Sequence, residues 1–274
     1  MPVLNKLVKL YHNEGFQIST GLNPCHFENY PLASFTRLIR DGESQTNGLG
    51  IAMQEVYFLE CLFDGFQPQN IFIIGNSFGW STLALGLLNP EAQIIAIDSG
   101  YDAKSIEGIK LTNKLAEKAG LSRLKVIRGA SPQDVSPIIE KELGGKVDFA
   151  FIDGLHTNEQ IVLDFNAIKA YGTDDSVYLF HDIHEFDLYQ GFETIAQHPD
   201  YQSRILMGTP SGVGLVYPNA APDHIYDTVE TFSLSTNLSK VIEQEVWGWK
   251  HRHLKRYKNS IQKRVKKLNA LLGR

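Results

Sequence analysis

The feature that most constrains the fold is a series of short apolar runs, each followed by residues with helical spacing. The runs are Ile71–Ile74, Ile94–Ile97, Leu124–Ile127, Val147–Ile152 and Ser176–Phe180. Strands that are buried on both faces read as continuous apolar runs, and such strands separated by helices of about 10 to 15 residues are typical of βαβ units. The sequence therefore predicts an α/β fold with a doubly wound, Rossmann-like, mostly parallel sheet.

The segments around these runs suggest three parts. Residues 1–69 contain many glycines and prolines and one helical pattern over 51–66, so we expect an N-terminal cap of helices and loops. Residues 70–218 hold the strands and form the predicted core. Residues 219–274 are a C-terminal extension, which we expect to end in a basic amphipathic helix.

The distribution of charge separates the tail from the rest of the chain. Residues 240–274 hold 11 of the 26 Lys and Arg but only two of the 31 Asp and Glu, so residues 1–239 have a net charge of about −14. An acidic body disfavours nucleic acid as the main partner, because phosphate binding needs clustered Lys and Arg. No apolar run approaches the roughly 18 to 20 residues that span a bilayer, and the N-terminus lacks a signal-peptide pattern. With only Cys25 and Cys61, the sequence predicts a cytoplasmic protein without disulfides.

The turn after the first predicted strand indicates a ligand site. Glycines at 75 and 79 frame Asn76 and Ser77, and free N–H groups at the following helix start favour phosphate or carboxylate. Asp98 ends the next strand, where a carboxylate can accept hydrogen bonds from both ribose hydroxyls. Together they predict an adenosine-containing cofactor. NAD would favour a second glycine where Ser77 stands.

The fourth and fifth predicted strands end in Asp153-Gly154-Leu155-His156 and His181-Asp182-Ile183-His184. The carboxyl ends of parallel strands share one edge of the sheet, so these carboxylates and imidazoles should meet there. Proton removal from a hydroxyl, or a divalent cation held by carboxylates, would use such a cluster. Asp153 and Asp182 also suit helix capping, and His184 an exposed loop position.

These motifs resemble class I S-adenosylmethionine-dependent methyltransferases over about residues 50 to 218. The resemblance is carried by the glycine turn with Ser81-Thr82, by Asp98, and by Phe151-Ile152-Asp153-Gly154-Leu155-His156 and Phe180-His181-Asp182. More narrowly, the chain is similar to the branch with the macrocin O-methyltransferases, the cephamycin-type CmcI-like proteins and, more distantly, the catechol O-methyltransferases. The resemblance implies a seven-stranded sheet whose last strand, at about 212–217, is antiparallel.

The resemblance also implies roles for individual residues. S-adenosylmethionine would contact Gly75, Asn76, Ser77, Gly79, Asp98, Ser99, Ala130 and Ser131, with the last two beside the adenine. His156 would be the catalytic base, assisted by Asp153. Asp153, His181 and Asp182 would hold Mg²⁺ or another divalent metal. Two residues depart from the family: Ile73 stands where an acidic residue is common, and His181 replaces a carboxylate, which favours a softer metal or none.

The sequence therefore predicts an S-adenosylmethionine-dependent O-methyltransferase that acts on a small-molecule acceptor such as a sugar or another polyhydroxy natural product. A non-catalytic cofactor-binding or scaffold protein of the same fold remains an alternative, because of Ile73 and His181. An RNA methyltransferase that grips RNA through its basic tail is a second alternative.

The basic tail carries a narrow apolar stripe. Its residues are Leu254, Tyr257, Ile261, Val265, Leu268 and Leu272, which follow one another at steps of three or four. Such a stripe suits packing on the same domain or homo-oligomer formation. Association with an anionic membrane surface or a nucleic acid is the other interpretation.

Overall fold

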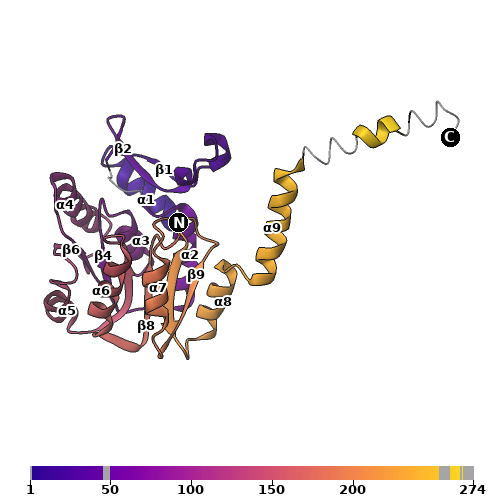
Figure 1. Ribbon diagram of the computed structural model, residues 1–274. Helices are drawn as coiled ribbons and strands as arrows, with labels where there is room; N and C mark the ends of the chain where they lie inside the picture. Colours follow the sequence, from indigo (N-terminus) through magenta and orange to yellow (C-terminus); the bar gives the residue numbers. More distant parts are fainter. Residues whose placement is uncertain (1, 46–49, 253–259, 266, 268–274) are drawn as a thin grey trace. The chain divides into compact units, whose positions relative to one another are not determined.

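The computed structural model describes residues 2–45, 50–252, 260–265 and 267. Its central sheet has seven strands in the order β6-β5-β4-β7-β8-β10-β9. Figure 1 shows β6, β4, β8 and β9 of this sheet one after another from left to right. Their bounds are β4 Asn70–Ile74, β5 Gln93–Asp98, β6 Leu124–Arg128, β7 Val147–Ile152, β8 Gly172–Phe180, β9 Tyr201–Leu206 and β10 Val213–Pro218. Strands β4 to β8 pair in parallel, and β10 lies antiparallel between β8 and β9. The predicted doubly wound sheet with an antiparallel last strand is confirmed.

The strand order reverses beside β4. From β4 the chain continues outward through β5 and β6 and then returns to the other side of β4 with β7 and β8. Ile73 accordingly pairs with Ala96 of β5 and with Phe151 of β7. The carboxyl ends of β4 and β7 lie side by side, which is the place where open α/β sheets bind ligands.

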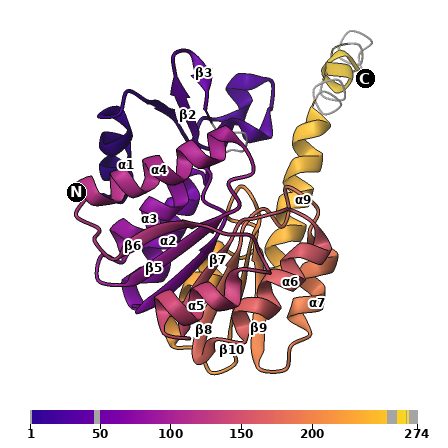
Figure 2. The ribbon, with the colours of Figure 1, turned by 90° about the vertical axis from the view of Figure 1, so that its left-hand side faces the viewer.

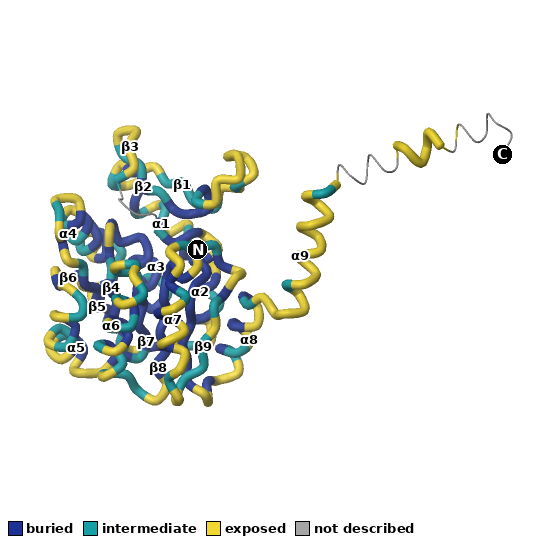
Figure 3. Tube along the Cα trace, in the orientation of Figure 1, coloured by how far each residue is buried: buried dark blue, intermediate teal, exposed yellow. Residues whose placement is uncertain are grey.

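Helices cover both faces of the sheet, and alternate residues of each strand face alternate layers. Ile71 and Ile73 belong to one buried cluster, Phe72 and Ile74 to the other. The first layer contains α1 Val3–His12, α2 Met53–Gly65, α3 Trp80–Leu88, α4 Ala103–Lys118 and α8 Asp223–Phe232. The second contains α5 Val135–Leu143, α6 Asn158–Lys169 and α7 Tyr189–Ala196 (Figure 2). Strands β4, β5, β7 and β10 are therefore buried from both sides, and the inner strands β4, β5 and β7 are mostly dark blue in Figure 3.

The N-terminal region differs from the expected mixture of short helices and loops. The short 3-10 helices η1 Pro24–Phe27 and η2 Pro31–Ser34 agree with it, but β1 Gln17–Ser19, β2 Arg37–Arg40 and β3 Glu43–Ser44 form a second, antiparallel sheet. Strands of two to four residues are too short for alternation of apolar and polar residues to stand out in a sequence. The cap is therefore partly β-structured.

Contacts divide the chain into two units, Met1–Ser233 and Leu234–Arg274. The second contains α9 Thr236–Lys250, which has no buried residue, and a further helical segment at 260–265. Of the predicted apolar stripe, Ile261 and Val265 are exposed, whereas Leu254, Tyr257, Leu268 and Leu272 lie outside the described residues. Within the described ranges, no helix combines the length and apolar character that crossing a bilayer requires.

Candidate active site

Two glycines shape the turn between β4 and α3. Gly75 has a φ of +92°, and a Cβ there would lie 1.9 Å from the backbone oxygen of Asp153, so only glycine lets β4 and β7 approach this closely. Gly79 has a φ of +81° and caps α3, where a Cβ would meet the Thr112 side chain at 2.1 Å. The turn is thus fixed by backbone geometry, and it presents Asn76 and Ser77 to a cavity.

The carboxylate of Asp98 anchors this turn. It accepts hydrogen bonds from the backbone N–H groups of Asn76 at 3.2 Å, Ser77 at 2.9 Å and Gly100 at 2.9 Å. Asp98 is thereby held in one orientation at the end of β5 while it still lines the cavity. Ile73, where the family commonly has an acidic residue, is fully buried in the core, so its side chain faces no ligand.

A cavity of about 870 Å³ lies over the carboxyl ends of β4, β5 and β7, within the size range of ligand pockets. Its wall includes most residues predicted from the sequence: Gly75, Asn76, Ser77, Asp98, Ser99, Ala130, Ser131, Asp153, His156 and Asp182. Gly79 and His181 are not part of the wall. The structure therefore brings ten of the twelve predicted site residues to one cavity, and the other two are chain neighbours of residues in its wall.

One end of the cavity contains a polar group that the sequence analysis missed. Asp164 of α6 is 1% exposed, and its carboxylate accepts hydrogen bonds from Ser131 Oγ and from Gln160 Nε2 at 2.7 Å. Its second oxygen, Oδ2, has no hydrogen-bond partner among the described residues. Burial raises the pKa of Asp164, although the bonds from Ser131 and Gln160 oppose this. The sequence did contain a signal for this site, because Asp164 is an acidic residue between Ile161 and Ile168 on the apolar face of a helix.

The ends of β7 and β8 form a cluster of carboxylates and imidazoles. Asp153 and His181 both continue the strand hydrogen bonding, through Asp153 N to Ile74 O at 2.8 Å and His181 N to Ile152 O at 3.0 Å. His181 Nδ1 lies 3.0 Å from Asp182 Oδ1 and 3.5 Å from Asp153 Oδ1. One atom from each of these three residues can be chosen so that all lie within 4.8 Å of one another. The predicted metal residues are thus close together.

His156 lies on the cavity side of this cluster. Its Nε2 is 3.2 Å from Asp153 Oδ1 and 3.3 Å from Asp182 Oδ2, and its ring stacks on Phe186 with centroids 4.3 Å apart. Burial lowers the pKa of His156, but the hydrogen bond and charge of Asp153 and the charge of Asp182 outweigh it and raise the pKa overall. His184, by contrast, is absent from the cavity wall and contacts Tyr189 Oη at 2.5 Å.

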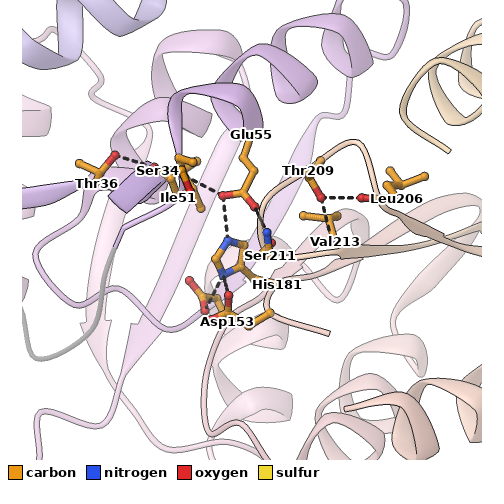
Figure 4. A network of polar contacts seen from close by, with 12 residues as sticks. Ser34, Thr36, Ile51, Glu55, Asp153, His181, Leu206, Thr209, Ser211 and Val213 are labelled. Atoms are coloured by element: carbon orange, nitrogen blue, oxygen red, sulfur yellow. Dashed lines mark hydrogen bonds and ion pairs between the residues drawn. The ribbon is translucent and has the colours of Figure 1, made fainter. Parts of the chain in front are cut away.

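Behind the cluster lies Glu55, a second residue that sequence reasoning missed. It comes from α2 and is 2% exposed, and its Oε2 is 3.2 Å from His181 Nε2 (Figure 4). Burial raises the pKa of Asp153, yet the charges and hydrogen bonds of His181 and His156 bring it down to about 2. The same carboxylates raise the pKa of His181 well above its ordinary value against the effect of burial. The cluster is therefore a charged, mutually stabilised group.

Residues 72–183, which run from within β4 to just past β8 and hold nearly all of these groups, match a family described as a methyltransferase domain. The chain contains a methyltransferase domain. The match includes the glycine turn and Asp98, which are residues predicted to contact S-adenosylmethionine. No curated protein matches this methyltransferase in sequence.

Solved structures share the fold of this methyltransferase at low sequence identity. Cofactor-bound Rv0187 from MTB has a TM-score of 0.53 and 16% identity, and the match covers 80% of this chain and 90% of that one. A Staphylococcus aureus protein described as a caffeoyl-CoA O-methyltransferase has a TM-score of 0.51 and 12% identity, over 60% of this chain and 83% of its own. At such identities the likeness concerns the fold. The narrower macrocin or CmcI-like branch stays a prediction.

Proposed function

We propose that this methyltransferase transfers the methyl group of S-adenosylmethionine to a hydroxyl oxygen of a small polyhydroxy molecule, such as a sugar. The observation that carries the proposal is the position of His156, Asp153 and Asp182. They stand on the wall of the same cavity as the glycine turn, and Asp153 touches Gly75. A group able to take a proton is therefore adjacent to the predicted cofactor position.

The cavity suits an adenosine-containing methyl donor. Asp98 supplies a carboxylate for ribose hydroxyls, and the turn at Ala130 and Ser131 offers a place for the adenine. Asn76 contributes Oδ1, a buried acceptor with no hydrogen-bond partner among the described residues, which suits the ammonium of the methionine part. The sulfonium of the donor supplies its own leaving group, so the protein mainly positions the acceptor and removes its proton.

His156 is suited to remove this proton. If Nε2–H is donated to Asp153 and Asp182, the remaining lone pair is on Nδ1, and the imidazolium that forms on proton uptake is stabilised by the two carboxylates. The acceptor O–H bond then breaks as the O–CH₃ bond forms, and the proton stays on His156. An aliphatic hydroxyl is too weakly acidic to ionise unaided near neutral pH, so a sugar acceptor needs such help.

The residues Asp153, His181 and Asp182 also fit a divalent cation. Their donor atoms are two carboxylate oxygens and one imidazole nitrogen, the buried Nδ1 of His181, which lies 3.0 Å from Asp182 Oδ1 and 3.5 Å from Asp153 Oδ1. When bound, a cation would stabilise the charge that develops on the acceptor oxygen. The nitrogen donor favours Mn²⁺, Fe²⁺, Co²⁺ or Zn²⁺ over Mg²⁺.

A methyl-transfer assay with labelled S-adenosylmethionine and a panel of sugars and other polyols tests the proposal. We expect transfer to a hydroxyl oxygen and tight binding of S-adenosylhomocysteine in calorimetry. Activity that survives exhaustive chelation would remove the metal while leaving His156 as the base. Transfer to nitrogen or carbon acceptors, with no hydroxyl methylated, would contradict the proposal.

A further inference from the structure

The buried Glu55 is fixed by more contacts than a helix cap requires. Oε2 accepts a hydrogen bond from the N–H of Ala52 at 2.7 Å and contacts His181 Nε2 at 3.2 Å. Oε1 accepts from the N–H of Ser211 at 3.0 Å and from Ser211 Oγ. Each carboxylate oxygen thus has two partners, which come from the N-cap of α2, from the segment before β10 and from the residue after β8 (Figure 4). The carboxylate has little freedom to move.

This arrangement determines how the His181 ring is presented. Glu55 is acceptor-only when ionised, so its contact with Nε2 requires a proton on that nitrogen. The other nitrogen, Nδ1, then points toward Asp182 and Asp153, at 3.0 and 3.5 Å. The rings of Phe35 and Phe151, at centroid distances of 6.4 and 6.0 Å, flank the imidazole and leave it 2% exposed. With a cation between the three residues, a neutral His181 held in this way would offer its Nδ1 lone pair to the same ion as the two carboxylates.

We propose that Glu55 is a positioning residue that holds His181 with Nε2 protonated and Nδ1 presented as a metal ligand beside Asp153 and Asp182. Carboxylates that orient ligating histidines through the second ring nitrogen are a general feature of metal sites. The inference rests on the metal-assisted form of the proposed function. It explains why a carboxylate from the N-terminal region is buried behind the cavity, where it touches no ligand.

A purely structural salt bridge between Glu55 and a permanently protonated His181 is the competing explanation. Co²⁺ and Zn²⁺ serve as probes because both accept imidazole and carboxylate ligands. Co²⁺ affinity is measured by calorimetry and visible absorption on the full chain for wild type, Glu55→Gln and Ser211→Ala. Ser211→Ala is the matched control, because it removes one hydrogen bond to Glu55 and leaves the contact with His181.

We expect Glu55→Gln to weaken Co²⁺ binding by about 10- to 100-fold, the usual loss when such a partner of a ligand is replaced. Affinity for S-adenosylhomocysteine should stay within about twofold, and Ser211→Ala should keep the wild-type Co²⁺ affinity. In a His181→Ala background, Glu55→Gln should have no further effect on Co²⁺. Unchanged Co²⁺ affinity in Glu55→Gln, or parallel losses of Co²⁺ and S-adenosylhomocysteine binding, would overturn the proposal.

A measurement on wild type alone covers the case in which Glu55→Gln does not fold. Long-range ¹H–¹⁵N correlation of the Zn²⁺-loaded protein should show His181 protonated at Nε2 and ligated through Nδ1. Ligation through Nε2, or no binding of either metal, would refute the inference. Neither readout involves an acceptor, so a failure to methylate polyols would leave this result intact.

Discussion

At the scale of single residues, His156 is the group on which the proposed reaction depends most. We expect His156→Gln to lower kcat by about two to four powers of ten, which is the usual effect of removing a general base. Affinity for S-adenosylhomocysteine should stay unchanged, because the side chain contacts Asp153, Asp182 and Phe186 and none of the groups around the glycine turn. Steady-state kinetics and calorimetry measure the two effects.

His184→Gln is the matched control for this prediction. His184 follows the same strand but pairs with Tyr189 away from the cavity wall, so its replacement should leave kcat within about threefold of wild type. Full activity of His156→Gln on the true acceptor would show that the histidine is structural and that another group removes the proton.

Asp98 holds the glycine turn and is proposed to bind the ribose hydroxyls, and one substitution can separate these two roles. Asp98→Asn keeps an oxygen that can accept N–H groups of the turn but has fewer acceptor sites for ribose hydroxyls. We expect a loss of about 1 to 3 kcal/mol in S-adenosylhomocysteine binding, the scale of an unmet polar contact. Asp148→Asn serves as control, because Asp148 likewise accepts the N–H groups of Gln69 and Asn70, at 3.1 and 2.9 Å, outside the cavity wall. Calorimetry that shows equal affinities for both variants would contradict the role of Asp98.

Asp164 should make stability depend on pH in a definite direction. Burial raises the pKa of Asp164 above the ordinary value of 3.8. As the pH rises through 3.8, Asp164 therefore loses its proton in the unfolded chain before it does so in the folded chain. The folded state then binds more protons, and its stability falls until the pH exceeds the raised pKa.

Asp164→Asn removes this titration while Asn can still accept hydrogen bonds from Ser131 and Gln160. The melting temperature of the variant should therefore rise relative to that of wild type as the pH is raised from about 4 to about 7. Thermal unfolding at several pH values measures the difference. A difference that does not change with pH would show that Asp164 titrates as an ordinary carboxyl.

At the scale of elements, the close approach of β4 and β7 creates the site. Gly75→Ala should destabilise the fold by about 2 to 5 kcal/mol, because it adds a cost for positive φ and an overlap with Asp153 O. Gly144→Ala is the control, since Gly144 also has a positive φ of +64° but a Cβ there would meet nothing within 4 Å. It should cost only about 1 to 2 kcal/mol. If urea unfolding shows that both variants lose the same free energy of unfolding, the added Cβ at position 75 does not overlap with Asp153 O.

The N-terminal elements take part in the site as well as covering the sheet. Glu55 in α2 contacts His181, and Leu32 and Phe35 around η2 line the cavity together with Leu38 of β2. These apolar side chains form part of the wall that an acceptor would meet. A cap that the sequence suggested only as a covering region thus supplies both a polar and an apolar part of the candidate site.

At the scale of the whole molecule, we expect the first unit to bind the cofactor and the second unit to mediate association. A chain that ends at Ser233 keeps every described element of the first unit, so we expect it to fold and to bind S-adenosylhomocysteine with wild-type affinity. Exposed apolar side chains on α9, namely Leu238, Val241, Ile242, Val246, Trp247 and Trp249, would be removed together with the basic tail. We therefore expect the shortened chain to associate less with itself or with anionic vesicles.

Light scattering after size exclusion measures self-association, and sedimentation with anionic and neutral vesicles measures membrane attachment. RNA binding is tested in parallel, because the tail is the only strongly basic segment of the sequence. Loss of cofactor binding in the shortened chain would place the tail in the catalytic unit. Unchanged behaviour in all three assays would exclude each of the partner interpretations.

The sheet and the residues at the ends of its strands could be predicted from local sequence patterns. Short continuous apolar runs between helical segments are typical of strands buried on both faces, and parallel strands bring their carboxyl ends to one edge of the sheet. For this reason Gly75, Asp98, Asp153 and Asp182 could be placed in one cavity from the sequence. The antiparallel direction of the last strand was predicted only from the family resemblance, because the sequence pattern of one short strand does not show its direction.

Only the tertiary structure decided which distant groups complete the site. Glu55 and His181 are 126 positions apart, and Glu55 and Ser211 are 156 apart, so no local pattern could pair them. Asp164 looks like one more helix residue until the turn at Ser131 is placed against it. The strands β1 to β3 are too short to be distinguished from loops without their partners. Motifs are local and follow from the chain itself, whereas burial and pairing depend on contacts that exist only after the chain has folded.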